Sequence, residues 1–334
     1  MMDMMDTPNP ELVWNTITAH QRSAALRAAV DVGVFAVLSE APRTAAEIAE
    51  RCHVPERGIR ILCDFLTIHG LIAKRDGGYI HTATSAVFLS PHSPASLAPS
   101  VRFLMNNKIM QASSRLTETI RRGHTALDVP LAGEEVDEWV TFARTMQPFV
   151  AGAAEFMAGQ LDKGAPPKKV LDVAASHGMF GLAVARHSPG CEIVALDFPS
   201  VLEVTAEHAR NAGVALTLLP GSAFTADLGD GYDGILVTNL FHHFSQAECV
   251  SLMKRFHAAL IPGGRLLVLE FVPNDDRVTP PLPASFSMMM LANTAEGDAF
   301  TRSQYTEMLQ EAGFAACEFM DVPQSPQQLI VAVR

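Results

Sequence analysis

Small and ionisable residues follow the apolar segments of this sequence at positions where strand ends would bring them together. Asp172 lies within the apolar segment 170–173, which the small residues 174–178 follow, and a second apolar segment, 192–196, ends on Asp197. This order predicts the first half of a nucleotide-binding β-α-β unit. Small residues let backbone approach a ligand, the helix N-terminus offers N–H donors, and a carboxylate at the second strand end suits a ribose diol.

The turn after the first segment lacks the glycine pattern of a dinucleotide site. Only Gly178 and Gly181 supply glycine there, whereas G-x-G-x-x-G needs three. Asp172 disfavours a phosphate and favours a cationic or amino-bearing ligand, directly or through water. A sulfonium amino acid joined to adenosine meets these demands, so we expect S-adenosylmethionine. The alternative is a small-residue turn between a strand and a helix that binds nothing.

Two adjacent histidines, His242 and His243, follow another apolar segment, 232–238. A strand end beside the expected cofactor favours a functional role for them over packing. Imidazole has a pKa near neutrality, which suits a base that removes a hydroxyl proton as a methyl group arrives. Adjacent residues on a tight turn point in different directions, so we expect one to face the acceptor. Glu270 ends the next apolar segment, and it is either the carboxylate that holds this imidazole in the right tautomer or an exposed strand-end acid.

Apolar segments alternate with helix-forming segments from about residue 165 to the C-terminus. Near-continuous apolar strands in this arrangement predict a Rossmann-like α/β domain with a mostly parallel sheet covered on both faces. Ligands bind at the carboxyl ends of such strands. The segments expected as strands are 170–173, 192–196, 215–219, 232–238, 265–271 and 327–333.

The N-terminal part has a different pattern. Helix-forming segments at 12–38, 44–52 and 58–69 precede a short hairpin around the turn 75–77, which is the layout of a winged helix-turn-helix. The helix before the hairpin has only Arg57 and Arg60 as cations, so we favour an interaction or dimerisation role over DNA binding.

Met- and Phe-rich helical segments are expected at 101–110 and 138–160. Such segments are most often core, but these precede the cofactor domain, where they would line a substrate pocket. The residues expected to form pocket walls are Phe142, Met146, Phe149, Met289, Met290 and Asn293, with His243 beside them.

Composition limits the possible partners. The 334 residues carry a net charge of −11, which argues against nucleic acid because phosphate binding needs clustered Lys and Arg. No apolar segment reaches the ~20 residues that span a membrane, and residues 1–10 are unlike a signal peptide. The five cysteines have no C-x-x-C spacing, so we expect a cytoplasmic protein with reduced thiols and no metal.

Almost the whole chain resembles the S-adenosylmethionine-dependent small-molecule O-methyltransferases of the caffeate, isoflavone and acetylserotonin type. AALRAAVDVGVF and PERGIRILCDFLTIHGLI are similar to the winged-helix dimerisation domain of that family. The resemblance implies a dimerisation domain at 1–110, a helical connector that contributes to the substrate pocket at 111–164, and a class I methyltransferase domain at 165–334. It also implies a homodimer and a small aromatic secondary-metabolite acceptor, with S-adenosylhomocysteine as the cofactor product.

Four motifs carry the resemblance. Residues 172–178 match D-x-G-G-G-x-G, ALDFPSVL matches an acidic-x-Pro segment, GSAF matches G-D-M-F, and LFHHFS matches the catalytic-base segment L-H-D-W-S. The resemblance places the base on His242, rather than His243, and a steering acid on Glu270. The residues it implies for cofactor binding, with those inferred above from the strand ends, are Asp172, Ala174, Ser176, Gly178, Asp197, Phe198, Ser222, Ala223, Phe224 and Asn239.

Three departures from the family pattern bear on the chemistry. Ala174, Ala175 and Ser176 replace glycines, and Ser222 replaces an acid that would meet the adenine amine. Ala299 stands where the family has a second acid, with Glu296 and Asp298 as possible substitutes.

Other functions remain open at this point. The histidine pair and Glu270 could hold a metal that enolises a 2-oxo acid for C-methylation, although adjacent histidines seldom both bind one ion. The chain could also be a winged-helix regulator, or a methyltransferase scaffold that performs a different reaction.

Overall fold

The computed structural model describes residues 8–128, 137–161 and 165–334. Packing of Cα atoms divides the chain into two compact units, one up to Asn106 and one from Asn107 onward. The domain boundaries expected at 110 and 164 remain predictions. Residues 129–136 and 162–164, within the expected connector, lie outside the described residues.

The first unit contains a helical bundle and a hairpin. A capping box of Thr44 and Glu47 begins the third helix, as the sequence pattern predicts. The helix expected over 12–38 is divided at Gly33, whose φ of 92° is left-handed and ends an α-helix. The elements are α1 (Pro10–Val32), α2 (Val34–Leu38), α3 (Ala45–Cys52), α4 (Glu56–Ile68), β1 (Ile72–Arg75), β2 (Gly78–His81), α5 (Ala83–Phe88) and α6 (Ala98–Leu104).

The second unit is built on a sheet of seven strands among its described residues, in the order β5-β4-β3-β6-β7-β9-β8. The strands from β5 to β7 are parallel, and β9 is antiparallel to both β7 and β8. The strands are β3 (Lys169–Val173), β4 (Glu192–Asp197), β5 (Thr217–Pro220), β6 (Tyr232–Thr238), β7 (Leu260–Glu270), β8 (Cys317–Asp321) and β9 (Gln328–Val333). This mostly parallel α/β sheet confirms the predicted fold class.

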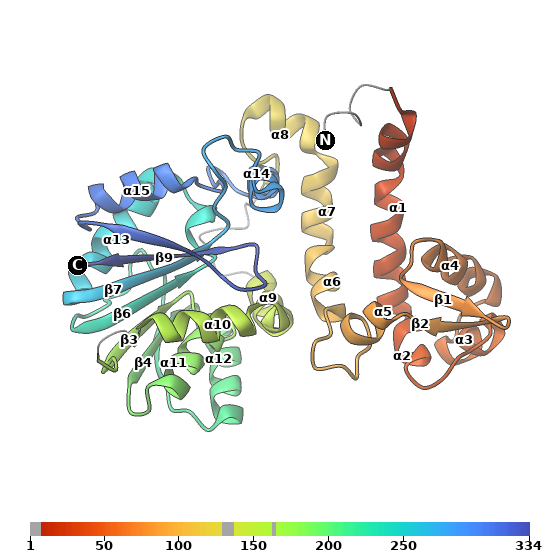
Figure 1. Ribbon diagram of the computed structural model, residues 1–334, viewed down its shortest axis with the longest axis horizontal. Coiled ribbons are helices and arrows are strands. Elements are labelled where there is room, and N and C mark those ends of the chain that lie inside the picture. Colours follow the sequence, from red (N-terminus) through yellow and green to blue (C-terminus); the bar gives the residue numbers. More distant parts are fainter. Residues whose placement is uncertain (1–7, 129–136, 162–164) are drawn as a thin grey trace. The chain divides into compact units, whose positions relative to one another are not determined.

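Helices cover both faces of this sheet (Figure 1). Alternate strand residues contribute to two separate cores, as the period of two requires. Leu171 and Ile235 pack in the core of α13 and α15, whereas Val170 and Leu236 pack with α10 and α11. The helical elements are α7 (Asn107–Ser114), α8 (Leu116–Arg122), α9 (Asp137–Thr145), α10 (Gln147–Leu161), α11 (Met179–His187), α12 (Pro199–Ala212), the 3-10 turn η1 (Phe241–His243), α13 (Gln246–Ala259), α14 (Pro281–Asn293) and α15 (Arg302–Glu311).

Two further helices expected to be continuous are divided in the structure, and one strand was missed. The helix expected over 138–160 is two helices, divided between Thr145 and Gln147, because Pro148 interrupts the hydrogen-bond ladder. The helix expected over 101–110 is divided between α6 and α7. Strand β8 was missed, because CEFMD has too few apolar residues to signal a strand and pairs only along one edge of the sheet.

Candidate active site

The loop between β3 and α11 is held in an unusual backbone conformation. Ala174, Ser176 and Gly178 all have positive φ, at 52°, 54° and 72°. The loop is fixed to β4, since the Ala175 N–H donates to Leu196 O at 3.0 Å. A Cβ on Gly178 would lie 2.8 Å from Thr205 Cγ2, so this position requires glycine. The other two residues adopt the left-handed conformation without being glycine, which stores strain in the loop.

Asp172 points from β3 toward the start of α11 and is 1% exposed. Its Oδ2 accepts the Gly181 N–H at 2.9 Å, and among the described residues its Oδ1 has no hydrogen-bond partner. Burial, with a smaller contribution from the carboxylate of Asp197, raises the pKa of Asp172 to about 7. Gly181 makes this approach possible, because a Cβ there would lie 3.0 Å from Asp172 Oδ2.

Asp197 lies at the carboxyl end of β4, next to the same loop. Its Oδ2 accepts the Ser176 N–H at 2.8 Å and its Oδ1 accepts the Phe198 N–H at 2.7 Å. Asp172 on β3 and Asp197 at the end of the neighbouring β4 therefore both lie next to this loop, and β3 borders the switch in strand order between β3 and β6, where doubly wound sheets bind ligands.

The remaining cofactor candidates follow β5 and β6. The Gly221 N–H donates to Asp197 O at 2.9 Å, which places Ser222, Ala223 and Phe224 after the end of β5 and beside β4. The Phe224 ring meets the edge of Phe244 at 4.9 Å between centroids, and Ser222 Oγ accepts the Phe224 N–H at 3.3 Å.

Asn239 follows β6 with a left-handed φ of 55°. Its N–H donates to Leu269 O at 3.0 Å, and its Oδ1 accepts a hydrogen bond from Gln327 Nε2. No sequence pattern pointed to Gln327, because its contact with Asn239 depends on the turn between β8 and β9, which approaches β6 only in the folded sheet.

A buried histidine–glutamate pair lies at the ends of β6 and β7. His242 Nδ1 and Glu270 Oε2 are 2.6 Å apart, and the two residues are 4% and 0% exposed. Glu270 Oε1 also accepts the Phe241 N–H at 2.9 Å. One carboxylate therefore holds both the imidazole ring and the backbone of η1, and Glu270 is not the exposed strand-end acid that was the alternative.

Aromatic rings surround this pair. Phe286 of α14 meets the edge of His242 at 4.9 Å and stacks on Phe271 at 4.2 Å. His243 lies 4.3 Å from His242 between ring centroids and 5.3 Å from Trp139 of α9. The sequence pattern did not single out Phe286 and Trp139, because an aromatic residue on an apolar helix looks the same in the core and in a site.

His243 is held as a neutral imidazole. Burial, and then the neighbouring His242, lower its pKa well below the ordinary value. Within the described part of the chain, its Nδ1 is buried without a hydrogen-bond partner.

The other predicted pocket residues differ in position. Asn293 is 3% exposed, its Nδ2 donates to Met289 O at 2.9 Å, and its buried Oδ1 has no partner among the described residues. Met290 is buried, whereas Met289 and Phe149 are 37% and 47% exposed. Phe142 lies 6.2 Å from Trp139 between ring centroids, which connects it to His243, and Met146 is half-buried.

The two acids near Ala299 do not face the histidine pair in the contacts described. Asp298 pairs with Arg277 at 3.0 Å, and Glu296 is exposed. Ala299 itself is fully buried and has no polar side-chain atom. Among the described residues, Glu270 is thus the carboxylate that contacts His242.

Two family models match the chain. The model of the O-methyltransferase domain covers residues 142–315, and that of the O-methyltransferase dimerisation domain covers residues 14–91. The first alone covers more than half of the sequence. The chain belongs to the O-methyltransferase family. This confirms the predicted resemblance, and the protein is an S-adenosylmethionine-dependent O-methyltransferase.

Individual relatives extend over nearly the whole O-methyltransferase chain. A protein of known structure from Nostoc punctiforme, assigned to the O-methyltransferases, is 41% identical, with a TM-score of 0.95 over 98% of this chain and 100% of that one. The 3-hydroxy-5-methyl-1-naphthoate 3-O-methyltransferase of Streptomyces sahachiroi is 28% identical over 91% of this chain and 89% of its own. Human N-acetylserotonin methyltransferase in complex with S-adenosylmethionine shares the fold, with 23% identity and a TM-score of 0.85 over 100% and 99% of the two chains.

The site residues fit the methyl donor. Asp172 Oδ1 and Ser176 Oγ are buried polar atoms without partners among the described residues, which a bound amino group or a bridging water would satisfy. Gly178 and Gly181 let the loop pack closely against Thr205 and Asp172. Within the described ranges, no group of three or more His, Cys, Asp or Glu residues could hold a metal, and no helix is long and apolar enough to span a membrane.

Proposed function

We propose that this O-methyltransferase methylates a hydroxyl of a small aromatic acceptor and that His242 is its general base. The buried hydrogen bond of 2.6 Å between His242 Nδ1 and Glu270 is the observation that carries the proposal. Glu270 is an acceptor, so the proton of a neutral His242 belongs on Nδ1 and Nε2 keeps a lone pair. Nε2 is then the atom that removes the acceptor's hydroxyl proton.

Glu270 is proposed to position His242. Its second oxygen accepts the Phe241 N–H, so the carboxylate resists both rotation of the ring and movement of the turn. The positive charge that forms on the imidazole would be balanced by the same buried carboxylate.

The cofactor would bind along the ends of β3, β4 and β5. We propose that Asp172, with Ala174, Ser176 and Gly178, holds the methionine end and that Asp197 accepts hydrogen bonds from the ribose. Phe198, Ser222, Ala223, Phe224 and Asn239 are proposed to surround the adenosine. When bound, S-adenosylmethionine supplies a methyl group on a cationic sulfur, and the chain's part is to align the acceptor oxygen with it.

The residues around His242 suit a flat apolar acceptor with a few polar groups. The stacked Phe271 and Phe286 rings offer an aromatic surface next to the base. The unpartnered Asn293 Oδ1 and His243 Nδ1 are proposed to bond polar groups of the acceptor. The other proposed pocket residues are Phe142, Met146, Phe149, Met289 and Met290.

The names of the relatives agree with such an acceptor and with a role in secondary metabolism. They include a naphthoate 3-O-methyltransferase, an 8-O-methyltransferase of tetracenomycin polyketide synthesis and a mitomycin biosynthesis 6-O-methyltransferase. The match to the dimerisation domain supports a homodimer formed through the N-terminal unit.

The test uses purified protein, S-adenosylmethionine and a panel of hydroxynaphthoates, N-acetylserotonin, catechols and non-aromatic alcohols. We expect methylation of an aromatic hydroxyl, and we expect His242→Gln to lower kcat at least 100-fold without changing S-adenosylmethionine affinity. Glu270→Gln should act in the same direction. His187→Gln, an exposed histidine paired with Glu155, is the control. A His242→Gln variant with wild-type kcat would refute the base assignment.

A further inference from the structure

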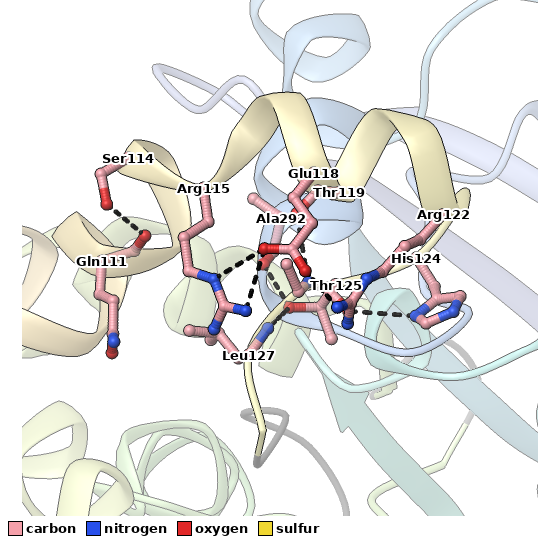
Figure 2. Close-up of polar contacts among 11 residues, drawn as sticks. Gln111, Ser114, Arg115, Glu118, Thr119, Arg122, His124, Thr125, Leu127 and Ala292 are labelled. Carbon is pink, nitrogen blue, oxygen red and sulfur yellow. Dashed lines mark hydrogen bonds and ion pairs between the residues drawn. The ribbon is translucent and has the colours of Figure 1, made fainter.

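Thr125 fastens the segment after α8 to the C-terminal end of α14 (Figure 2). Its hydroxyl donates to Ala292 O at 2.6 Å and its N–H donates to Thr294 O at 3.2 Å. The same hydroxyl oxygen accepts the Leu127 N–H at 3.1 Å. Helix ends leave carbonyls without intrahelical partners, so one residue satisfies two carbonyls at the end of α14.

The local fold presents Thr125 in this position. Helix α8 ends at Gly123, whose φ of 77° turns the chain, and the Thr119 hydroxyl then accepts the Ala126 N–H at 3.2 Å. Thr125 is 3% exposed, so its contacts are made away from solvent.

The contacts continue from α14 to η1 (Phe241–His243), which we call the catalytic turn because it contains the proposed base, His242. Thr294 Oγ1 donates to Met290 O at 2.7 Å and accepts the Gly297 N–H at 3.0 Å. Gly297 packs directly on the histidine turn, because a Cβ there would lie 2.2 Å from His242 O and 3.0 Å from the His243 carbonyl carbon. The path from Thr125 through Thr294 and Gly297 therefore reaches the backbone of His242.

This path holds the side of the turn that Glu270, the carboxylate bonded to the His242 ring, does not hold. Glu270 holds the His242 ring and the N–H side of the turn, whereas Gly297 packs on the carbonyl side. The chain has Ala299 near this point and pairs Asp298 with Arg277, so no second acid among the described residues contacts the ring.

We propose that Thr125 is a positioning residue for His242, acting through Thr294 and Gly297 to hold the catalytic turn against Glu270. The inference rests on the proposed role of His242 as the base. It gives the segment 123–127 a part in the reaction. The sequence does not reveal this part, because the segment is far from the other site residues in the chain.

The first experiment follows the His242–Glu270 hydrogen bond without any acceptor. Protein labelled with ¹⁵N-histidine and saturated with S-adenosylhomocysteine is studied by NMR, and the His242 Nδ1–H resonance is assigned with His242→Gln. Thr125→Val keeps the side-chain shape but removes the hydroxyl. We expect it to shift or broaden this resonance, while Thr125→Ser retains it.

The second experiment measures kcat with an acceptor found in the panel above. Thr125→Val should lower kcat about tenfold to a hundredfold, with S-adenosylhomocysteine affinity unchanged. Gly297→Ala should lower it further, because the turn must move to admit the Cβ. Gly159→Ala in α10, where a Cβ meets open space, is the matched control.

Several outcomes would overturn the proposal. A folded Thr125→Val protein with an unchanged resonance and unchanged kcat would show that Thr125 only supports the fold, and the base assignment would stand. Failure of Thr125→Ser to restore either measurement would also contradict the hydroxyl's role. If wild type shows no hydrogen-bonded Nδ1–H resonance, the histidine–glutamate pair itself is refuted, and the positioning role with it.

Discussion

Replacing Asp172 by Asn is expected to change how the stability of the ligand-free protein depends on pH. Asp172 is buried with one carboxylate oxygen unpartnered among the described residues, and its pKa is raised to about 7. Since this pKa lies above the ordinary value of 3.8, the protonated form is favoured by the fold. The contribution of protonated Asp172 to the free energy of unfolding is fully present below about pH 3.8 and is lost as the pH rises through 7.

The magnitude follows from the two pKa values. Between pH 5 and about 6.5 the unfolded chain has already lost this proton while most folded molecules keep it. The free energy of unfolding then falls by about 1.4 kcal/mol for each pH unit. Because half of the folded molecules have lost the proton at pH 7, the fall between pH 5 and 7 is roughly 2 kcal/mol. The Asn side chain does not titrate, so the stability of Asp172→Asn relative to wild type should rise by this amount. Other groups such as His177, whose pKa burial lowers to about 4, cancel in the comparison.

Urea unfolding at pH 5, 6, 7 and 8 without ligand measures this difference. S-adenosylmethionine titrations at the same pH values measure the functional counterpart. Wild-type affinity should increase with pH as the carboxylate forms to meet the amino group, whereas Asp172→Asn should bind weakly at every pH. A stability difference that stays constant from pH 5 to 8 would refute the reasoning, because it would mean that Asp172 is ionised in the folded protein throughout.

Three further predictions concern other parts of the chain. Tyr305→Phe should leave kcat unchanged and raise the free energy of unfolding by about 1 kcal/mol, because the Tyr305 hydroxyl is buried without a partner among the described residues. A fall in kcat would contradict this, because it would show that the hydroxyl takes part in the reaction. Ala174→Gly should not reduce stability in thermal or urea unfolding, because the φ of 52° at Ala174 lies in the left-handed region that glycine adopts without strain. The control Ala185→Gly within α11 should lower the free energy of unfolding by about 1 kcal/mol. Equal losses would mean that Ala174 is unstrained. Trp14→Glu, at a side chain 66% exposed on the same helix as the exposed Leu12 and Ile17, should weaken a homodimer at least tenfold in sedimentation experiments. The control Gln21→Glu adds the same charge to the same helix, and equal effects of the two changes would argue against an apolar contact at Trp14.

Much of the fold was predictable because its signals are local. Near-continuous apolar segments separated by helix-forming segments require a parallel sheet with two covered faces, and β3, β4, β6 and β7 follow from that pattern. Thr44 with Glu47 and Ser245 with Glu248 mark helix starts through capping boxes, which need only four residues of sequence. The local signal was weak for the edge strand β8. At Gly33 and Pro148 the signal was present, but the helical pattern on both sides concealed the break.

The sequence by itself determined which residues follow each strand and that they gather at one edge of the sheet. The carboxyl ends of parallel strands meet at that edge whatever the loops do. Asp172, Asp197, His242 and Glu270 could be chosen on that ground. Only the tertiary structure decided that Glu270 holds both the His242 ring and its turn, that Asp298 turns to Arg277, and that Thr125 reaches α14. These contacts join residues far apart in the chain, and their distances follow from how helices pack against the sheet.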